Sequence, residues 1–600
     1  MAYSPKEAAF IHGEYISPSV LEESTGDRSH DAYVAVIKPL DGKRPSEIRI
    51  IDDPEVPIYI TKPGCRVNTV KKEFEEKSKL DMYRTPYKDI PQTIWKALNN
   101  TYTYGGRQQW QRPPMHLRLK QMQSNPYVYG ADIDLGVHIK MAYKKANGGK
   151  MPMEYNIGFF DIETDVNGTN QIILITFMNG DGETYVGILR EFFLGHTEQE
   201  VIDMWNSDVE PSLRSKLNKD GMKAYEKAGG IRLHVQICDG EVNLIKWVFD
   251  KIHMHKPDFI GVWNMSFDIP YILKRLEFRG IDPRQIFCSA EVPWKYRYCK
   301  YKDDPGKPGG HLVDRWPWFH CTSFTRWIDS LMLYGRIRKA KPREPSYKLD
   351  AIGGKEIGSG KLEFGSGETH STMQRFHQVK YTVYNIVDVL IMWIMCKKNH
   401  DVRSMMMLIN DSMLDSYAHQ SVMLKDYFYD YLGKKNCVTA TIGNRIDDPW
   451  DYLIHNIGGA VLDPSKADIA VPVLKEDDIV VRASRDVCDI DVSSMYPSLL
   501  ELLNCSKETK LCTVLSIDNT KRRGTIKLRE NEDKEDPVIL DKARCPGYKH
   551  FDVTAFFTDA IYTEANAIEV GKRFSLPGFD GIVEYMKRKH PTITERSRAA

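Results

Sequence analysis

Residues 159–168 read Phe-Phe-Asp-Ile-Glu-Thr-Asp-Val-Asn-Gly. Side chains alternate between the two faces of a β-strand, so Asp161 and Glu163 project from one face and Ile162 from the other. Two like charges on one strand face repel each other unless a positive group neutralises them. A divalent cation does this best, because hard cations prefer carboxylate oxygens. The stretch alone leaves two interpretations open, a metal site and a solvated strand edge.

The composition is typical of a soluble intracellular protein with several domains. A length of 600 residues exceeds one hydrophobic core and predicts roughly three to five domains. The net charge is +1, so any affinity for nucleic acid must come from local basic patches. Eleven cysteines without a Cys-x-x-Cys pair favour reduced thiols over disulfides or zinc. The N-terminus lacks a signal-peptide pattern and no apolar run approaches a membrane span, so we expect no membrane partner.

The region around the acidic stretch predicts a mixed sheet. Asn-Gly and Asp-Gly at residues 179–182 separate two β-like runs, which is a strong hairpin signal. An antiparallel meander followed by alternating strands and helices indicates a ribonuclease-H-like α/β sheet, with its active site at strand ends. The expected elements are strands at 171–178, 183–189, 232–238 and 258–263 and a helix at 242–253.

Residues 1–150 form a separate N-terminal domain in this interpretation. Short strands are expected at 34–37 and 48–51, and a charged helix at 69–79. No pattern there carries chemistry, so packing or docking is the expected role and weak single-strand contact is the alternative.

Two further acidic positions lie in helical contexts. Asp268 follows a predicted strand and precedes Pro270, where it could simply cap a helix. Tyr384 and Asp388 are four residues apart on an amphipathic helical pattern and therefore share one helix face. Each position alone is compatible with an ordinary helix surface.

Together these positions carry a resemblance. FDIET at 160–164, FDIPYI at 267–272 and YNIVDV at 384–389 resemble the three motifs of the DEDDy 3′→5′ exonucleases of family B DNA polymerases. Residues 329–334, 346–350 and 360–362 are similar to that domain in replicative polymerases of large tailed bacteriophages. Asn264 and Phe267 are separated by two residues, where that phage group has three.

The resemblance implies two-metal phosphodiester hydrolysis. Two Mg²⁺ ions about 4 Å apart activate water and neutralise charge on the phosphate. Asp161 would bridge both ions, Glu163 and Asp388 would complete the nucleophile side, and Asp268 would hold the second ion through water. Tyr384 would orient the attacking water. Asn264 and Phe267 would contact DNA.

Residues 294–302 interleave aromatic and basic side chains before a Gly- and Pro-rich turn at 303–310. This pattern predicts a β-ribbon, which in related polymerases helps to separate primer from template. An ordinary amphipathic hairpin is the alternative. A basic cluster spans residues 336–343 and is either a phosphate contact or a solvated loop.

The second half resembles the start of a polymerase. Residues 401–485 form a helical bridge, in which Gly458 and Gly459 resemble the loop that tracks template phosphates. Residues 489–498 are very similar to polymerase motif A. By this resemblance Asp491 and Val492 would bind two further Mg²⁺ ions, and backbone amides near Ser494 and Met495 would cradle the triphosphate. Tyr496 would pack under the sugar and exclude a 2′-hydroxyl.

The second palm aspartate and the fingers motif are absent from the sequence, so we expect a truncated or split polymerase. The predicted fold is α/β and α+β: an N-terminal domain (1–150), a ribonuclease-H-like exonuclease domain (151–400), a bridge (401–485) and an incomplete palm (486–600). Expected partners are primer-template DNA, dNTPs, a second polypeptide completing the palm, and a sliding clamp reached through the absent C-terminus. The expected location is the cytoplasm of an infected bacterial host. The alternatives are a stand-alone DEDDy exonuclease and a non-catalytic DNA-holding subunit.

Overall fold

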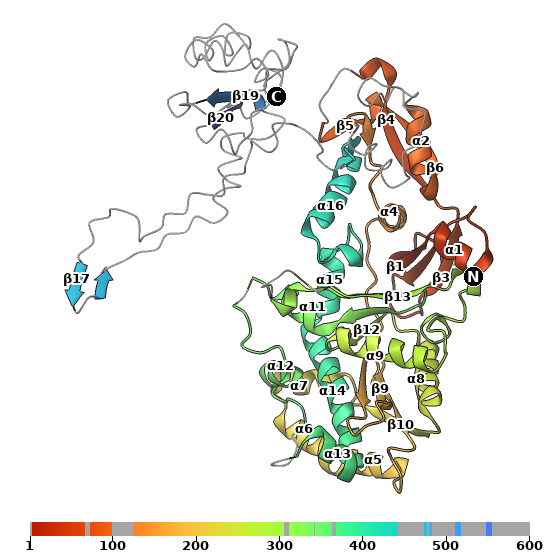
Figure 1. Cartoon of the computed structure of the whole chain (residues 1–600), viewed down its shortest axis with the longest axis vertical. Helices are drawn as coiled ribbons and strands as arrows, with labels where there is room; N and C mark the ends of the chain where they lie inside the picture. Colours follow the sequence, from red (N-terminus) through yellow and green to blue (C-terminus); the bar gives the residue numbers. More distant parts are fainter. Residues whose placement is uncertain are drawn as a thin grey trace. The chain divides into compact units, whose positions relative to one another are not determined.

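The chain divides into two compact units, Met1–Asn444 and Arg445–Ala600 (Figure 1). The computed structural model describes residues 3–66, 72–98, 125–304, 306, 311–340, 342–362 and 368–441, and in the second unit the strands 473–476, 479–482, 510–517 and 548–554. Several predicted site residues lie outside the described residues: Gly458, Gly459, Asp491, Val492, Ser494, Met495 and Tyr496. In the second unit β17 (Val473–Glu476) pairs antiparallel with β18 (Ile479–Arg482), and β19 (Lys510–Ile517) with β20 (Tyr548–Thr554).

A six-stranded sheet forms the centre of the first unit. Its order is β11-β10-β9-β8-β12-β15. The antiparallel pairs are β8 with β9 and β9 with β10, and the other three neighbouring pairs are parallel. The bounds are β8 Ile157–Thr164, β9 Ile172–Met178, β10 Glu183–Leu189, β11 Arg232–Cys238, β12 Phe259–Val262 and β15 Arg326–Asp329. The predicted meander and the strands after it are confirmed.

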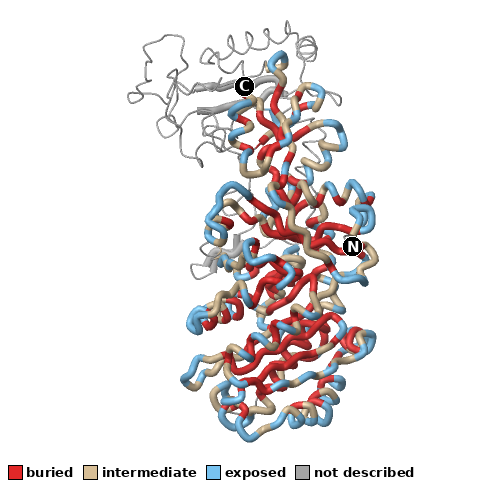
Figure 2. Tube along the Cα trace, turned by 90° about the vertical axis from the view of Figure 1, so that its right-hand side faces the viewer, coloured by how far each residue is buried: buried red, intermediate tan, exposed pale blue. Residues whose placement is uncertain are grey.

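Helices cover both faces of this sheet. The Phe160 ring packs 5.9 Å from Phe249 of α8 (Glu241–His255), whereas Asp161 accepts a hydrogen bond from Asn385 of α14 (Gln378–Asn399). Adjacent residues of β8 therefore face different helices, as strand alternation requires. The predicted helix at 242–253 is confirmed as part of α8. Buried residues follow the strands in Figure 2.

Helix α14 is long and apolar enough to cross a membrane by length and composition. In its most apolar window 83% of the residues are buried inside the protein. Packing against β8 and β9 explains that apolar composition, because a helix enclosed by protein on most sides has few solvent-facing positions.

The N-terminal region contains two smaller sheets, ordered β1-β2-β3 and β6-β4-β7. The strands expected at 34–37 and 48–51 are confirmed within β2 and β3. The bounds are β1 Ala8–Ile16, β2 Ala32–Pro39, β3 Glu47–Asp52, β4 Glu55–Thr61, β6 Leu80–Pro86 and β7 Val128–Tyr129, with helices α1 Pro18–Thr25, α2 Ile90–Ala97 and α4 Leu135–Asn147.

The helix expected at 69–79 is wrong over its described part. Residues Phe74–Glu76 form β5, which pairs with β16 (Cys437–Thr439), and Lys77–Lys79 form a 3₁₀ turn. Glu75 is buried and pairs with Lys72 at 2.7 Å and with Lys79 at 3.6 Å. The strongly charged segment was expected to be helical, but two of its lysines pair with a buried carboxylate on a strand whose partner strand lies far along the chain.

A buried ion pair joins the N-terminal sheet to the central sheet. Lys38 of β2 lies 2.8 Å from Asp258, immediately before β12, and both side chains are almost fully buried. Asp258 also accepts from Ser46 and from the Asn156 amide. These contacts connect the N-terminal sheet to the central sheet within the first unit. A domain boundary near residue 150 stays a prediction.

The predicted ribbon is confirmed in part. β13 (Cys299–Lys302) pairs antiparallel with β14 (Trp318–Cys321), but Trp294–Tyr296 form a 3₁₀ turn, not a strand. Pro293 precedes this turn, and the Trp294 ring lies between the guanidinium groups of Arg284 and Arg297, at 4.7 and 5.4 Å. These two cation–π contacts fix the Trp294 side chain in the turn, so it is not part of the ribbon.

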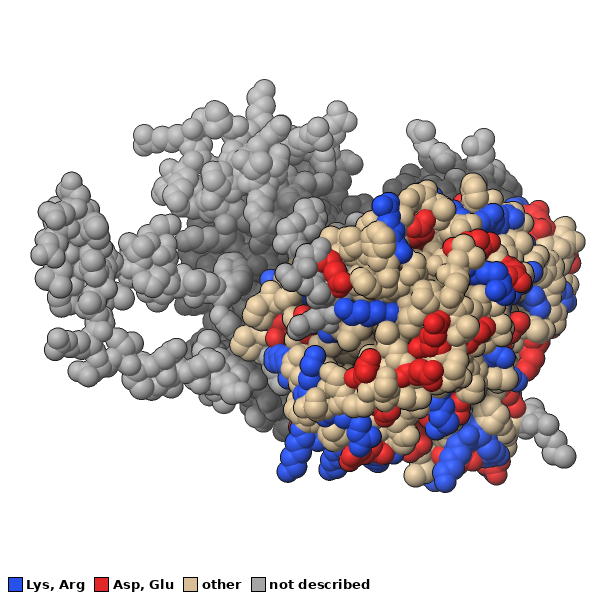
Figure 3. Space-filling view, turned by 90° about the horizontal axis from the view of Figure 1, so that it is seen from below, with Lys and Arg blue, Asp and Glu red and all other residues tan. Residues whose placement is uncertain are grey.

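Charged side chains of both signs are mixed on one face of the protein, and the helices not yet described complete the fold. Lysine, arginine, aspartate and glutamate are interspersed on the face shown in Figure 3. In the basic cluster Arg338 donates to Asp401 at 2.9 Å and Lys339 lies 3.2 Å from Asp314, while residue 341 is outside the described part. The remaining helices are α5 Glu198–Met204, α6 Glu210–Lys216, α7 Lys219–Lys227, α9 Met265–Phe278, α10 Arg284–Phe287, α11 Ser330–Ile337, α12 Leu349–Ile357, α13 His370–Phe376, α15 Asp401–Leu408 and α16 Gln420–Lys434.

Candidate active site

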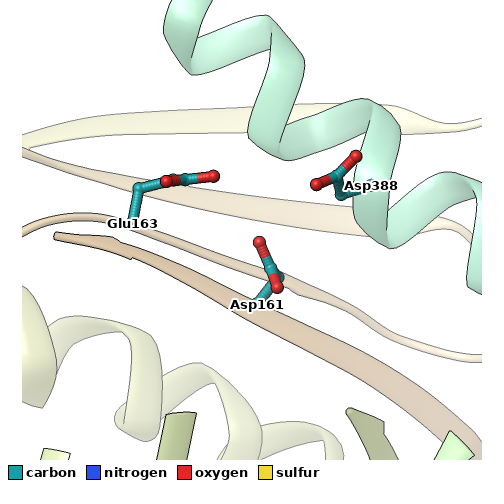
Figure 4. A group of neighbouring side chains, drawn as sticks. All are labelled: Asp161, Glu163 and Asp388. Atoms are coloured by element: carbon teal, nitrogen blue, oxygen red, sulfur yellow. The ribbon is translucent and has the colours of Figure 1, made fainter. Parts of the chain in front are cut away.

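Three carboxylates converge between β8 and α14. Asp161 and Glu163 come from β8, and Asp388 comes from α14 (Figure 4). One carboxylate oxygen of each residue lies within 4.8 Å of the corresponding oxygens of the other two. The strand period brings the first two to one face, and the helix laid across that face supplies the third.

Asp268 lies in the first turn of α9 and is 2% exposed. The helix begins at Met265 after Asn264, whose φ of 72° is left-handed, and the Met265 amide donates to Asp329 at 2.8 Å. Asp268 is therefore inside the helix and does not cap it. It stands outside the three-carboxylate group, yet its charge is among the causes that raise the pKa of Asp161.

Burial raises the pKa of each of the three carboxyl groups. Burial raises the pKa of Asp161 well above its usual range, and the charges of Asp268, Asp388 and Glu163 raise it further. Burial also raises the pKa of Glu163 to about 7 and that of Asp388 to about 6. Ionising all of these carboxylates is therefore costly, and a bound cation would lower that cost.

Lys361, which follows α12, is a site residue for which the sequence analysis assigned no role. Its ammonium donates to the Tyr384 hydroxyl oxygen at 2.8 Å and pairs with Asp388. Burial lowers the pKa of Lys361, but the neighbouring Asp388 outweighs this effect, so the net shift is upward. One lysine cannot neutralise four carboxylates.

Two more residues of α14 contact the strand carboxylates. The Asn385 side-chain amide donates to Asp161 at 2.6 Å, and the Tyr381 hydroxyl donates to Glu163 at 2.6 Å. Neither was assigned a role from sequence. The spacing from Asp388, three residues for Asn385 and seven for Tyr381, puts all three on one face of the helix but does not identify the strand carboxylates as their partners.

The residues present fit a divalent cation. Three hard oxygen ligands converge, and Asp388 Oδ1 is buried with no hydrogen-bond partner among the described residues. A buried carboxylate oxygen without a donor is costly, and a bound cation would satisfy it. Mg²⁺ itself stays a prediction.

Asn264 and Phe267 lie at the start of α9 and are both exposed. The Phe267 side chain is 47% exposed, and its ring lies 5.6 Å from that of Tyr271. The exposed Phe267 ring, one residue before Asp268, offers a face on which a base could stack.

Residues 113–292 match the family model described as DNA polymerase family B, exonuclease domain. This range contains Asp161, Glu163 and Asp268 but ends before Lys361, Tyr384 and Asp388. The three-dimensional structure thus brings residues outside the matched range to the acidic residues inside it. No curated protein matches the chain.

Proposed function

We propose that this chain is a 3′→5′ exonuclease of the family B DNA polymerase type, with a ribonuclease-H-like domain that removes mismatched 3′-terminal nucleotides. The observation that carries the proposal is the convergence of Asp161, Glu163 and Asp388 within 4.8 Å in a domain whose N-terminal part matches that family.

The proposed roles follow from position. The charges of Asp268, Asp388 and Glu163 all act on Asp161, so Asp161, Glu163, Asp388 and Asp268 would together hold the metal ions, with Asp161 as their common neighbour. When bound, two Mg²⁺ ions supply an activated water and neutralise charge on the scissile phosphate. Tyr384, whose hydroxyl accepts from Lys361, orients that water.

DNA binding is proposed at the start of α9. Phe267 and Asn264 would hold the unpaired 3′ end, with the Phe267 ring stacking on a base. The β13–β14 ribbon adjoins this place, because the Tyr301 hydroxyl donates to Ser266 at 3.2 Å. The ribbon is thereby connected to the helix that carries Asp268, which suits a role in separating primer from template.

A polymerase role is proposed from sequence alone. Asp491 and Val492 would bind Mg²⁺, Ser494, Met495 and Tyr496 would bind a dNTP, and Gly458 and Gly459 would follow the template. Synthesis would need a second palm aspartate, which a second polypeptide or a further segment would supply. A sliding clamp and phage replication in a bacterial cytoplasm complete this proposal.

One assay tests the exonuclease. A 3′-mismatched primer-template and a single strand are incubated with Mg²⁺ and the full chain, as wild type, Asp161→Ala and Asp491→Ala. We expect trimming by wild type and by Asp491→Ala, and none by Asp161→Ala. Trimming that survives in Asp161→Ala would refute the proposed site.

The same assay separates the alternatives. Trimming without primer extension, even when nucleotides and a candidate second polypeptide are added, would indicate a stand-alone exonuclease. DNA binding without trimming would indicate a non-catalytic subunit. Extension that is lost in Asp491→Ala would establish the polymerase role.

A further inference from the structure

Asn385 lies between two polar groups of the central sheet. Its side-chain amide donates to Asp161 Oδ2 at 2.6 Å, and its side-chain oxygen accepts from the Thr176 hydroxyl. Asn385 and Thr176 are both fully buried. Thr176 pairs directly with Asp161 across β8 and β9. The ionised carboxylate can only accept, so the amide nitrogen of Asn385 faces Asp161 and its amide oxygen is left to accept from the Thr176 hydroxyl.

Tyr381 does the same for the second strand carboxylate. Its hydroxyl donates to Glu163 Oε2 at 2.6 Å and accepts from the Gln374 side chain at 3.2 Å. Gln374 in turn donates to the carbonyl oxygen of Thr164 at 2.8 Å, at the end of the strand that carries Glu163. The tyrosine is thus held on the sheet by a side chain of α13.

Helix α14 thus supplies hydrogen-bond donors to both strand carboxylates as well as Asp388. Tyr381 and Asn385 are four residues apart and therefore share a helix face, as Asp161 and Glu163 share a strand face two residues apart. Two donors of the helix thus meet two acceptors of the strand in register. Without them each carboxylate could rotate away from its neighbours to relieve the repulsion between them.

We propose that Asn385 and Tyr381 are positioning residues that fix Asp161 and Glu163 in the arrangement that accepts the metal ions. This inference rests on the proposed function, because it assigns those carboxylates to metal binding. Neither residue touches the metal or the DNA in this proposal. Partners of this kind typically change metal affinity or activity by about 10- to 100-fold.

The test uses variants of the full chain that keep volume but remove one donor. Asn385→Leu removes the donor to Asp161, Tyr381→Phe removes the donor to Glu163, and Thr176→Val removes only the hydroxyl that orients Asn385. The matched control is Thr382→Val, because Thr382 is also buried in α14 but its hydroxyl donates to the Gln378 carbonyl of the same helix.

Two quantities are measured for each variant: the dissociation constant of Mn²⁺ by electron paramagnetic resonance, and the Mg²⁺ concentration that gives half the maximal trimming rate. We expect both to rise about 10- to 100-fold in Asn385→Leu and Tyr381→Phe. A smaller rise is expected in Thr176→Val, and no change in Thr382→Val.

Wild-type metal dependence in Asn385→Leu and Tyr381→Phe would overturn the proposal, as would an equal change in Thr382→Val. If Asn385→Leu does not fold, Tyr381→Phe and Thr176→Val decide, since both preserve side-chain shape. If wild type binds Mn²⁺ but trims no DNA, the proposed function fails, while the Mn²⁺ constants still decide whether these residues position the carboxylates.

Discussion

Lys361 forms an ion pair with Asp388, and its ammonium lies 4.9 Å from the centre of the Tyr384 ring. The two residues come from different elements, a segment after α12 and the middle of α14. Asp388 is buried, so its charge is poorly solvated and depends on this partner. The lysine thus keeps the third carboxylate of the site ionised.

Replacing Lys361 with methionine should impair trimming. The pKa of Asp388, already about 6, would rise when the neighbouring cation is lost, so less of the ligand is ionised near neutral pH. We expect the trimming rate at pH 7 to fall about 10-fold or more and its acidic limb to move to higher pH.

The matched controls separate charge from packing. Lys361→Arg keeps the charge and should retain most of the activity. Lys355→Met removes an exposed lysine that pairs with Glu344 and should have no effect. An unchanged rate and pH profile in Lys361→Met would show that Asp388 does not depend on this ion pair.

Because the pKa of Glu163 is raised, the stability of the metal-free protein should fall as the pH rises toward neutrality. A carboxyl whose folded-state pKa is raised from its ordinary 4.5 to about 7 stabilises the fold below the ordinary value, and that stabilisation is lost as the pH rises through 7. A glutamine at this position does not ionise, so Glu163→Gln should not lose this stability as the pH rises. In EDTA, we expect Glu163→Gln to become more stable relative to wild type between pH 5 and pH 8.

Each unit of pKa shift corresponds to about 1.4 kcal/mol, so the difference is large enough for thermal unfolding to detect. Mg²⁺ should reverse the order at pH 8, because it stabilises wild type through the ionised carboxylate. A stability difference that does not vary with pH would mean that Glu163 titrates normally in the folded protein.

Much of the central sheet could be predicted from local sequence. The turn residues at 179–182 define the hairpin between β9 and β10, and the alternation around Asp161 separates the two faces of β8, one of which α14 covers. The segment at 69–79 could not be predicted, because β5 exists only through its pairing with β16, more than 350 residues downstream. Burial of Glu75 then outweighs the helical charge pattern.

The sequence motifs predicted the acidic residues of the site and no other residues that contact them. Asp161, Glu163 and Asp388 meet as the resemblance implied, whereas Lys361, Asn385 and Tyr381 received no role. Their partners are defined by tertiary packing and not by spacing: Asn385 is 224 residues from Asp161 along the chain. No local pattern reports such a contact.

Asp268 should differ from the other acids in its effect on metal binding. It lies outside the group of three carboxylates, so the site formed by Asp161, Glu163 and Asp388 remains complete in Asp268→Asn. Calorimetric titration with Mn²⁺ should show two bound ions in wild type and one in Asp268→Asn, with trimming lost. Asp388→Asn should weaken the tighter of the two sites. The assignment fails if Asp268→Asn still binds two ions with wild-type affinity.

The buried pair of Lys38 and Asp258 should contribute strongly to the stability of the first unit. Lys38→Met leaves the Asp258 carboxylate almost fully buried without its ion-pair partner, with the Ser46 hydroxyl and the Asn156 amide as its hydrogen-bond donors. Breaking a buried pair in this way costs about 3–5 kcal/mol.

Arg214→Met is the matched control, because Arg214 and Glu226 form an exposed pair at 3.1 Å and such pairs contribute less than about 1 kcal/mol. Urea unfolding, followed by near-ultraviolet circular dichroism, measures the free energy of unfolding of each variant. Equal losses in the two variants would mean that the ion pair does not hold the two sheets together.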